Sequence, residues 1–224
     1  MDTLERAGYV PRKPLEMLME SFLLVPIQIL AVLFSIVLHE VSHGFMALNL
    51  GDRTAKDLGR LTLNPIKHLD LLGSIILPLL TFFVGGFIFG YAKPVPYNPY
   101  NLRDKKYGPA KVAMAGPLTN ISLAVLFGLV LRFLPSSGLP VSVQFVDLLQ
   151  FIVLINLVLA VFNLMPIPPL DGHWLVLTFV PDRYFQFKQA YARSGWLVFI
   201  IFLLFGFALI LPIVFWLFKL IVGG

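Results

Sequence analysis

Four long apolar runs, separated by polar and proline-rich segments, set the pattern of this chain. They cover approximately residues 17–48, 111–134, 144–164 and 195–219. Each run is near the roughly 20 residues that a helix needs to cross a hydrocarbon core of about 30 Å. The pattern therefore predicts an all-α, multi-pass membrane protein with about four full transmembrane helices.

A fifth apolar run, from Leu69 to Tyr91, has a different composition. Several of its residues are poor choices for a plain helix: Asp70, Gly73, Pro78 and the pair Gly85-Gly86. We expect a re-entrant hairpin at about 69–96, with a helix to Val84, a turn at Gly85-Gly86 and an extended return through "GYAKPVPY". This return and "RLTL" are also expected to be short β-like segments.

The overall composition agrees with a membrane protein. Hydrophobic residues make up 58% of the 224 residues and charged residues only 13%, and the mean hydropathy is +0.86. A soluble domain of this length cannot hide so much apolar surface. We expect residues 1–16 to form a surface tail and residues 17–224 a single membrane-embedded domain, because no repeat or linker divides the chain.

The basic residues carry information about topology. The formal net charge is +5, but Lys and Arg lie in the loops between apolar runs, so we interpret them as topology determinants and expect no nucleic-acid partner. If the fifth run is re-entrant, the side that receives the exit of the first span holds most of the Lys and Arg. The positive-inside rule then places that side in the cytoplasm.

The stretch "LHEVSH" at Leu38–His43 is the strongest chemical signal. His39 and His43 lie one helical turn apart, so both imidazoles project from one face, with Glu40 beside them. This H-E-x-x-H spacing suits a zinc hydrolase in which two His bind the metal and the Glu transfers a proton. A chance match is disfavoured, since a carboxylate in a membrane helix costs about 2.5–3.5 kcal/mol.

A third metal ligand must come from elsewhere in the chain. Catalytic zinc usually takes three protein ligands, and with no cysteine present they must be nitrogen or oxygen donors. Candidates near an apolar run are His68, Asp70, Asp147, Asp171 and His173. Asp171 stands out because it ends the proline-rich "NLMPIPPLDG" directly after a span. An ordinary N-cap of the following "GHWLVLTF" helix is an equally good interpretation of this residue.

Three motifs carry a family resemblance. "LHEVSHGFMALNLGD", "AMAGPLTN" and "FNLMPIPPLDG", in this order, resemble the site-2 protease family of intramembrane zinc metalloproteases, in its short prokaryotic form without a PDZ or CBS domain. The resemblance covers about residues 20 to 180. It implies one Zn²⁺ per chain, held by His39, His43 and Asp171, with Glu40 as the catalytic general base.

The same resemblance implies roles for two asparagines. Asn163 would hold the substrate backbone in an extended form, and Asn120 would pack near the site and contribute to substrate binding. A helix–helix hydrogen bond without a catalytic role is an equal alternative for Asn120. His173 stands where relatives commonly have glycine, and we expect it beside the ligands or on the surface.

The ligand positions constrain the fifth run. The His pair lies near the exit end of the first span and Asp171 just past the exit end of its own span, so both exits must open on one side of the membrane. A full crossing by the fifth run would place the ligands near opposite faces. The shared metal therefore favours the re-entrant hairpin.

These observations and the family resemblance together predict an enzyme of regulated intramembrane proteolysis, which hydrolyses peptide bonds in or near transmembrane segments of other membrane proteins. We expect it in the lipid bilayer of a prokaryotic cell membrane, with its active site toward the cytoplasm and an exposed extended edge that pairs with the unwound substrate. The alternatives are a metal transporter, which should show repeat-related halves that this sequence lacks, and an inactive binding relative. The sequence leaves the oligomeric state open.

Overall fold

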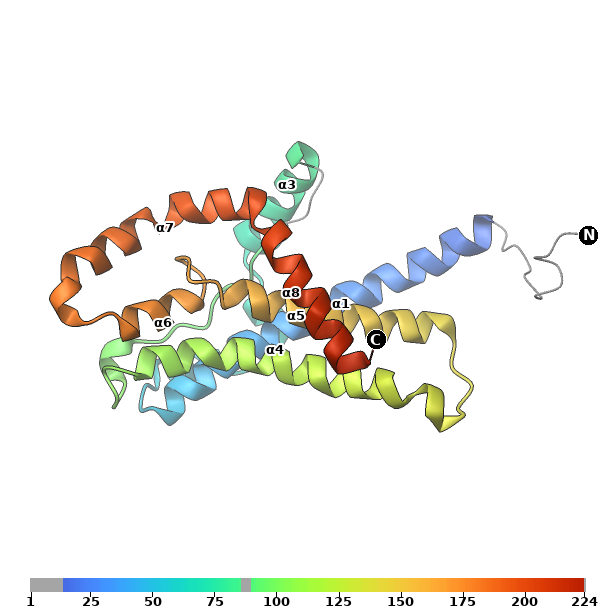
Figure 1. Cartoon of the computed structure of the whole chain (residues 1–224), viewed down its shortest axis with the longest axis horizontal. Helices are drawn as coiled ribbons and strands as arrows, with labels where there is room; N and C mark the ends of the chain where they lie inside the picture. The colour runs from blue at the N-terminus through green and yellow to red at the C-terminus, as the bar shows by residue number, and fades with distance from the viewer. Residues whose placement is uncertain (1–13, 86–89, 224) are drawn as a thin grey trace, which may run out of the picture.

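The computed structural model describes residues 14–85 and 90–223, and its elements are helices (Figure 1). The α-helices are α1 (Pro14–Asn49), α2 (Thr54–Asp57), α3 (Leu77–Gly85), α4 (Gly108–Phe133), α5 (Val143–Asn163), α6 (Gly172–Phe179), α7 (Phe185–Phe205) and α8 (Phe207–Val222). A π-helical turn, Leu72–Ile76, leads into α3. Residues 1–13 of the expected tail lie outside the described residues.

Three helices are long and apolar enough to cross a membrane. They are α1 from Leu24 onward, α4 and α5. The second and third match the predicted spans within three residues at each end, and the first ends within one residue of its prediction but begins at Leu24, seven residues later than predicted. With the bent pair described next, the number of candidate spans reaches four.

The predicted span at 195–219 is not one continuous helix, although the bent pair that covers it can still count as one span. The structure has two helices there, α7 and α8, which bend by 64° at a break beside Gly206. A Cβ at this glycine would lie 2.1 Å from the ring of Phe202, so the tight turn requires glycine. Pro212 adds to the break because it has no N–H for the carbonyl of Ala208 and its ring displaces that carbonyl.

The described part of the chain is built around α1, α4 and α5, which pack against one another, and α8 crosses α4 and α5 (Figure 1). Its main apolar core lies where α4, α5, α7 and α8 meet. The least exposed members of this core are Ala124, Val153, Leu157, Ile210 and Val214, each at most 1% exposed. Leu170, directly before the predicted ligand Asp171, also belongs to this core.

The fifth apolar run folds back on itself as the hairpin prediction requires. The Tyr91 N–H donates to the carbonyl of Gly73 at 3.0 Å, and the Lys93 N–H donates to that of His68 at 2.8 Å. The two legs therefore lie side by side at their base, while α3 projects away from the other helices (Figure 1). The helix begins at Leu72, not Leu69, because the Asp70 carboxylate accepts from the Gly73 N–H.

The predicted turn at Gly85-Gly86 falls at the gap 86–89, outside the described residues. The predicted β-like segments are wrong within the described part of the chain, where neither "RLTL" nor "GYAKPVPY" forms a strand. The return leg bonds to helical turns, not to another extended segment. Pro94 and Pro96 have no N–H to donate, so a regular ladder cannot continue through them.

A buried carboxylate anchors the loop that leads into α4. Asp52, just after α1, accepts hydrogen bonds from the backbone and hydroxyl of Thr54, from the Asn101 side chain and from the Asn98 N–H. Burial alone would raise the pKa of Asp52, but these hydrogen bonds lower it below its usual value overall. The loop is thereby tied to the end of α1 that carries the His pair.

Candidate metal centre

Three of the predicted ligands converge in the structure. His39 and His43 come from α1, and Asp171 comes from the turn between α5 and α6. The two Nε2 atoms are 3.0 Å apart, and Asp171 Oδ2 lies 3.1 Å from that of His39 and 3.2 Å from that of His43. Ligand atoms bound tetrahedrally to one zinc ion at about 2.0–2.1 Å would be about 3.3 Å apart. The triangle therefore fits one zinc ion.

The alternative interpretation of Asp171 as an N-cap is wrong. Asp171 does occupy the N-cap position of α6, but its side chain makes no capping hydrogen bond. Its carboxylate is directed at the two imidazoles instead. The proline-rich segment before it thus delivers an anionic oxygen to the end of α1.

Both imidazoles present the ring nitrogen that a metal needs. His43 Nδ1 lies 2.7 Å from the carbonyl oxygen of Val112, and His39 Nδ1 lies 2.6 Å from Asn120 Oδ1. An oxygen of this kind only accepts, so each Nδ1 carries the proton. Each Nε2 then keeps its lone pair, directed at the shared space, as metal-binding His usually does.

Gly116 on α4 keeps that shared space open. A Cβ at this position would lie 2.5 Å from the Nε2 atoms of both His39 and His43. Only glycine lets α4 come so close without filling the space where the ligand atoms meet. The glycine lies in "AMAGPLTN", but its role depends on helix packing that the sequence does not reveal.

We expect Gly116→Ala to lower zinc affinity by at least about tenfold, comparable to the loss of an outer-shell partner. The added methyl must push the imidazoles out of their common orientation. Gly128→Ala is the matched control. Gly128 is on the same helix, and a Cβ there would lie 2.4 Å from the Ile221 side chain, but no metal ligand is among its close neighbours. Equal zinc binding by both variants, measured by chelator competition, would contradict this role for Gly116.

A cavity of about 550 Å³ adjoins the three ligands, and Glu40 lines it. One Glu40 oxygen, Oε2, accepts a hydrogen bond from the Val95 N–H at 2.9 Å. Val95 stands between Pro94 and Pro96, so its N–H is the one backbone donor of that tripeptide. The return leg of the hairpin thereby orients the carboxylate beside the ligands.

The two predicted asparagines lie in different places. Asn163 lines the cavity, and its amide donates to the carbonyl of Leu159 at 2.9 Å. Asn120 is fully buried behind His39 and is not among the cavity-lining residues. This position does not fit the predicted substrate contact of Asn120. Asn120 makes a helix–helix hydrogen bond to Asn156 on α5, and its other amide atom contacts the ligand His39.

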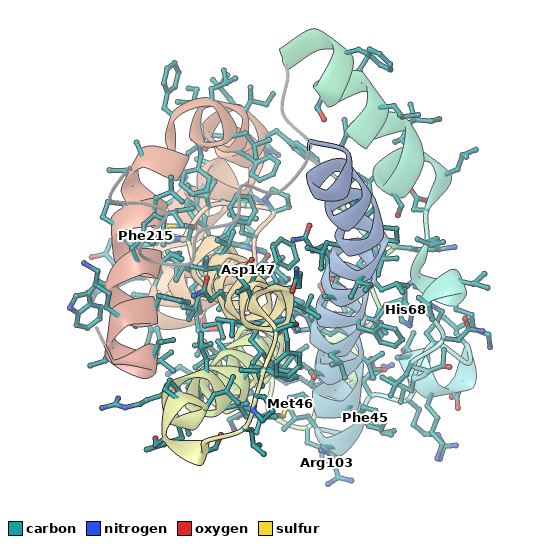
Figure 2. The ribbon with its side chains drawn as sticks, turned by 90° about the vertical axis from the view of Figure 1, so that its right-hand side faces the viewer. Phe45, Met46, His68, Arg103, Asp147 and Phe215 are labelled. Carbon is teal, nitrogen blue, oxygen red and sulfur yellow. The ribbon has the colours of Figure 1, made fainter. Side chains whose placement is uncertain are left out.

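The other two histidines are separate from the ligand cluster of the described residues. His173 Nδ1 lies 2.6 Å from the carbonyl of Leu170. His68 is buried beside α1 on the side away from α4 and α5 (Figure 2), with Nε2 2.8 Å from the carbonyl of Thr62. His173 is half-buried and is not part of the ligand triangle.

Tyr97 also lines the cavity, although sequence reasoning did not select it. Its hydroxyl is buried and has no hydrogen-bond partner among the described residues. Burial, with the nearby Asp171 carboxylate, raises the pKa of Tyr97 to about 12. The side chain is therefore a neutral phenol at physiological pH.

Comparison with known proteins decides the family. The model described as "Peptidase family M50" matches residues 27–207, most of the chain. The chain belongs to peptidase family M50. This is the site-2 protease family, so the resemblance of the three motifs is confirmed.

Two bacterial proteins named as zinc metalloproteases are similar to this chain over long stretches. "Putative zinc metalloprotease YwhC" of Bacillus subtilis is 37% identical over 183 residues, 80% of each chain. "Putative zinc metalloprotease Rip2" of Mycolicibacterium smegmatis is 36% identical over 143 residues, 63% of this chain and 52% of its own length. No solved structure gave a significant match. Family membership and the apolar helices together indicate a multi-pass membrane protein.

Proposed function

We propose that this M50 chain is an intramembrane zinc metalloprotease that cleaves transmembrane segments of other membrane proteins. The observation that carries the proposal is the convergence of His39, His43 and Asp171 within 3.2 Å of one another at the wall of a cavity that Glu40 also lines. All four side chains needed for metal-assisted hydrolysis are thus in one place.

The residues divide the chemistry between them. A zinc ion held by the three ligands would supply a Lewis acid that polarises the scissile carbonyl and lowers the pKa of its water. Glu40 takes a proton from the attacking water and delivers it to the leaving amine. The Val95 N–H keeps the Glu40 carboxylate pointed at the site during both transfers.

An extended substrate segment is favoured by the shape of the return leg. The N–H groups of Tyr91, Lys93 and Val95 all bond inward, to the hairpin base and to Glu40. Ala92 lines the cavity, and its N–H and carbonyl make no hydrogen bond within the described residues. An unwound substrate strand could pair there, with Asn163 on the opposite wall holding its backbone.

The membrane orientation follows from charge. Arg53, Lys56, Arg60, Lys93 and Arg103 lie near the exit end of α1, on the side where the ligands meet. The positive-inside rule then turns the active site toward the cytoplasm of a prokaryotic cell. The partners are transmembrane proteins and the surrounding lipid.

The experiment is a cleavage assay of purified wild-type protein in detergent with labelled transmembrane segments. We expect 1,10-phenanthroline to abolish cleavage, the non-chelating 1,7 isomer to leave it intact, and added zinc to restore it, because hydrolysis needs the metal. Mass spectrometry of the products should place the cut within the apolar segment. Cleavage that resists chelation, or cuts confined to polar tails, would contradict the proposal.

A further inference from the structure

A chain of buried polar side chains runs from the metal centre into the helix bundle. Asn120 and Asn156 are fully buried and Ser35 is only 4% exposed. They come from α4, α5 and α1, so the chain connects the three main helices. Leaving such groups unpaired in an apolar interior costs several kcal/mol. Each donor in this buried chain is therefore expected to face an acceptor.

Backbone carbonyls set the direction of the hydrogen bonds in this chain, and the shorter of these contacts is at the Asn156 end. The Asn156 amide nitrogen lies 2.8 Å from the backbone carbonyl of Ile152 and 3.0 Å from Ser35 Oγ. A backbone carbonyl can only accept, so the Asn156 atom facing it must be the NH₂ group. Asn156 Oδ1 must then face away from Ile152, toward Asn120.

The direction of the Asn120 amide determines which nitrogen of His39 carries the proton. Asn120 meets Asn156 Oδ1 with its own NH₂ group at 2.8 Å, and so must present Oδ1 to His39, at 2.6 Å. Since that oxygen only accepts, the His39 proton is held on Nδ1 and the Nε2 lone pair is free for a metal. His43 needs no such chain, because the Val112 carbonyl sets its tautomer directly and cannot flip.

We propose that Asn156 is a positioning residue of the metal centre, which fixes the amide direction of Asn120 and thereby the metal-binding tautomer of His39. The inference depends on the proposed zinc centre. It adds Asn156 to the residues on which the zinc affinity depends, although Asn156 contacts neither the metal site nor a ligand directly. The Asn120 NH₂ group has a second acceptor, the Ser35 carbonyl, but at 3.4 Å this hydrogen bond is long. Without the Asn156 oxygen, this long hydrogen bond alone opposes a flip of the Asn120 amide. A flipped amide donates to His39 Nδ1, which moves the ring proton to Nε2, where it blocks the metal.

The first test replaces Asn156 by Leu and measures zinc affinity by chelator competition. We expect affinity to fall by at least about tenfold, the low end of what an outer-shell partner contributes. Thr119→Val is the matched control: Thr119 Oγ1 lies 2.7 Å from Ser42 Oγ and joins α4 to α1, beside the chain but not in it. If Asn156→Leu does not fold, Asn156→Ser, which withdraws the oxygen without adding apolar bulk, is measured in its place.

A second readout needs no metal and no activity. The chain has four histidines, so ¹⁵N NMR of histidine-labelled, metal-free protein can assign the protonated nitrogen of each ring. We expect His39 to carry its proton on Nδ1 in the wild type and in Thr119→Val, and to gain an Nε2–H population in Asn156→Leu. His43 should not change in any of them.

A rescue variant separates positioning from simple packing. Asp at position 120 presents an accepting oxygen to His39 whichever way it turns, so Asn120→Asp removes the need for Asn156. We expect the double variant Asn120→Asp, Asn156→Leu to regain most of the zinc affinity lost in Asn156→Leu. A wild type that binds no zinc would refute the proposed function itself. A zinc-binding wild type with an unchanged Asn156→Leu, or no rescue by Asn120→Asp, would refute only this inference.

Discussion

Replacing Glu40 by Gln is expected to abolish proteolysis while the protein keeps its zinc. Gln has the same shape and still accepts the Val95 N–H through its amide oxygen, so the hairpin contact survives. It cannot take a proton, and loss of a positioned general base or acid costs about 10²–10⁴-fold in rate. The measurement is the cleavage rate together with zinc content by atomic absorption, both on the same preparation.

The control for this change is Asp57→Asn, which neutralises an exposed carboxylate on α2. It should leave cleavage and zinc content at wild-type values. If Glu40→Gln cleaved at the wild-type rate, Glu40 would not be the proton carrier. If the wild type transported metal across proteoliposomes and cleaved nothing, the transporter interpretation would hold instead.

Hydropathy predicts the main helices but not the break at the end of the chain. The first three spans follow from uninterrupted apolar runs, and each is recovered as one helix, α1, α4 or α5. The run at 195–219 is also strongly apolar, so nothing in its hydropathy distinguishes one continuous helix from two helices with a bend between them. The bend at Gly206 depends on the close approach of Phe202, a contact that the sequence pattern cannot reveal.

In the candidate site, too, the sequence predicts some residues and misses those whose roles depend on helix packing. His39, Glu40 and His43 follow from helical spacing, and Asp171 from its place after a span combined with the family motif. The residues that sequence reasoning missed act through contacts between helices: Gly116 by letting α4 approach, and Asn156 by orienting Asn120. The roles of Gly116 and Asn156 depend on groups that other helices supply, so they appear only when the helices are packed together.

Asp171→Ala is expected to remove zinc and activity together, in contrast to Glu40→Gln. It leaves two imidazoles as protein ligands where catalytic zinc usually has three, and its cost should exceed the roughly 10–100-fold that an outer-shell partner contributes. Asp182→Ala, on the exposed turn before α7, is the control. If Asp171→Ala kept zinc and activity but His173→Ala lost them, the third ligand would be His173 and not Asp171. His173 is the nearest alternative donor in sequence.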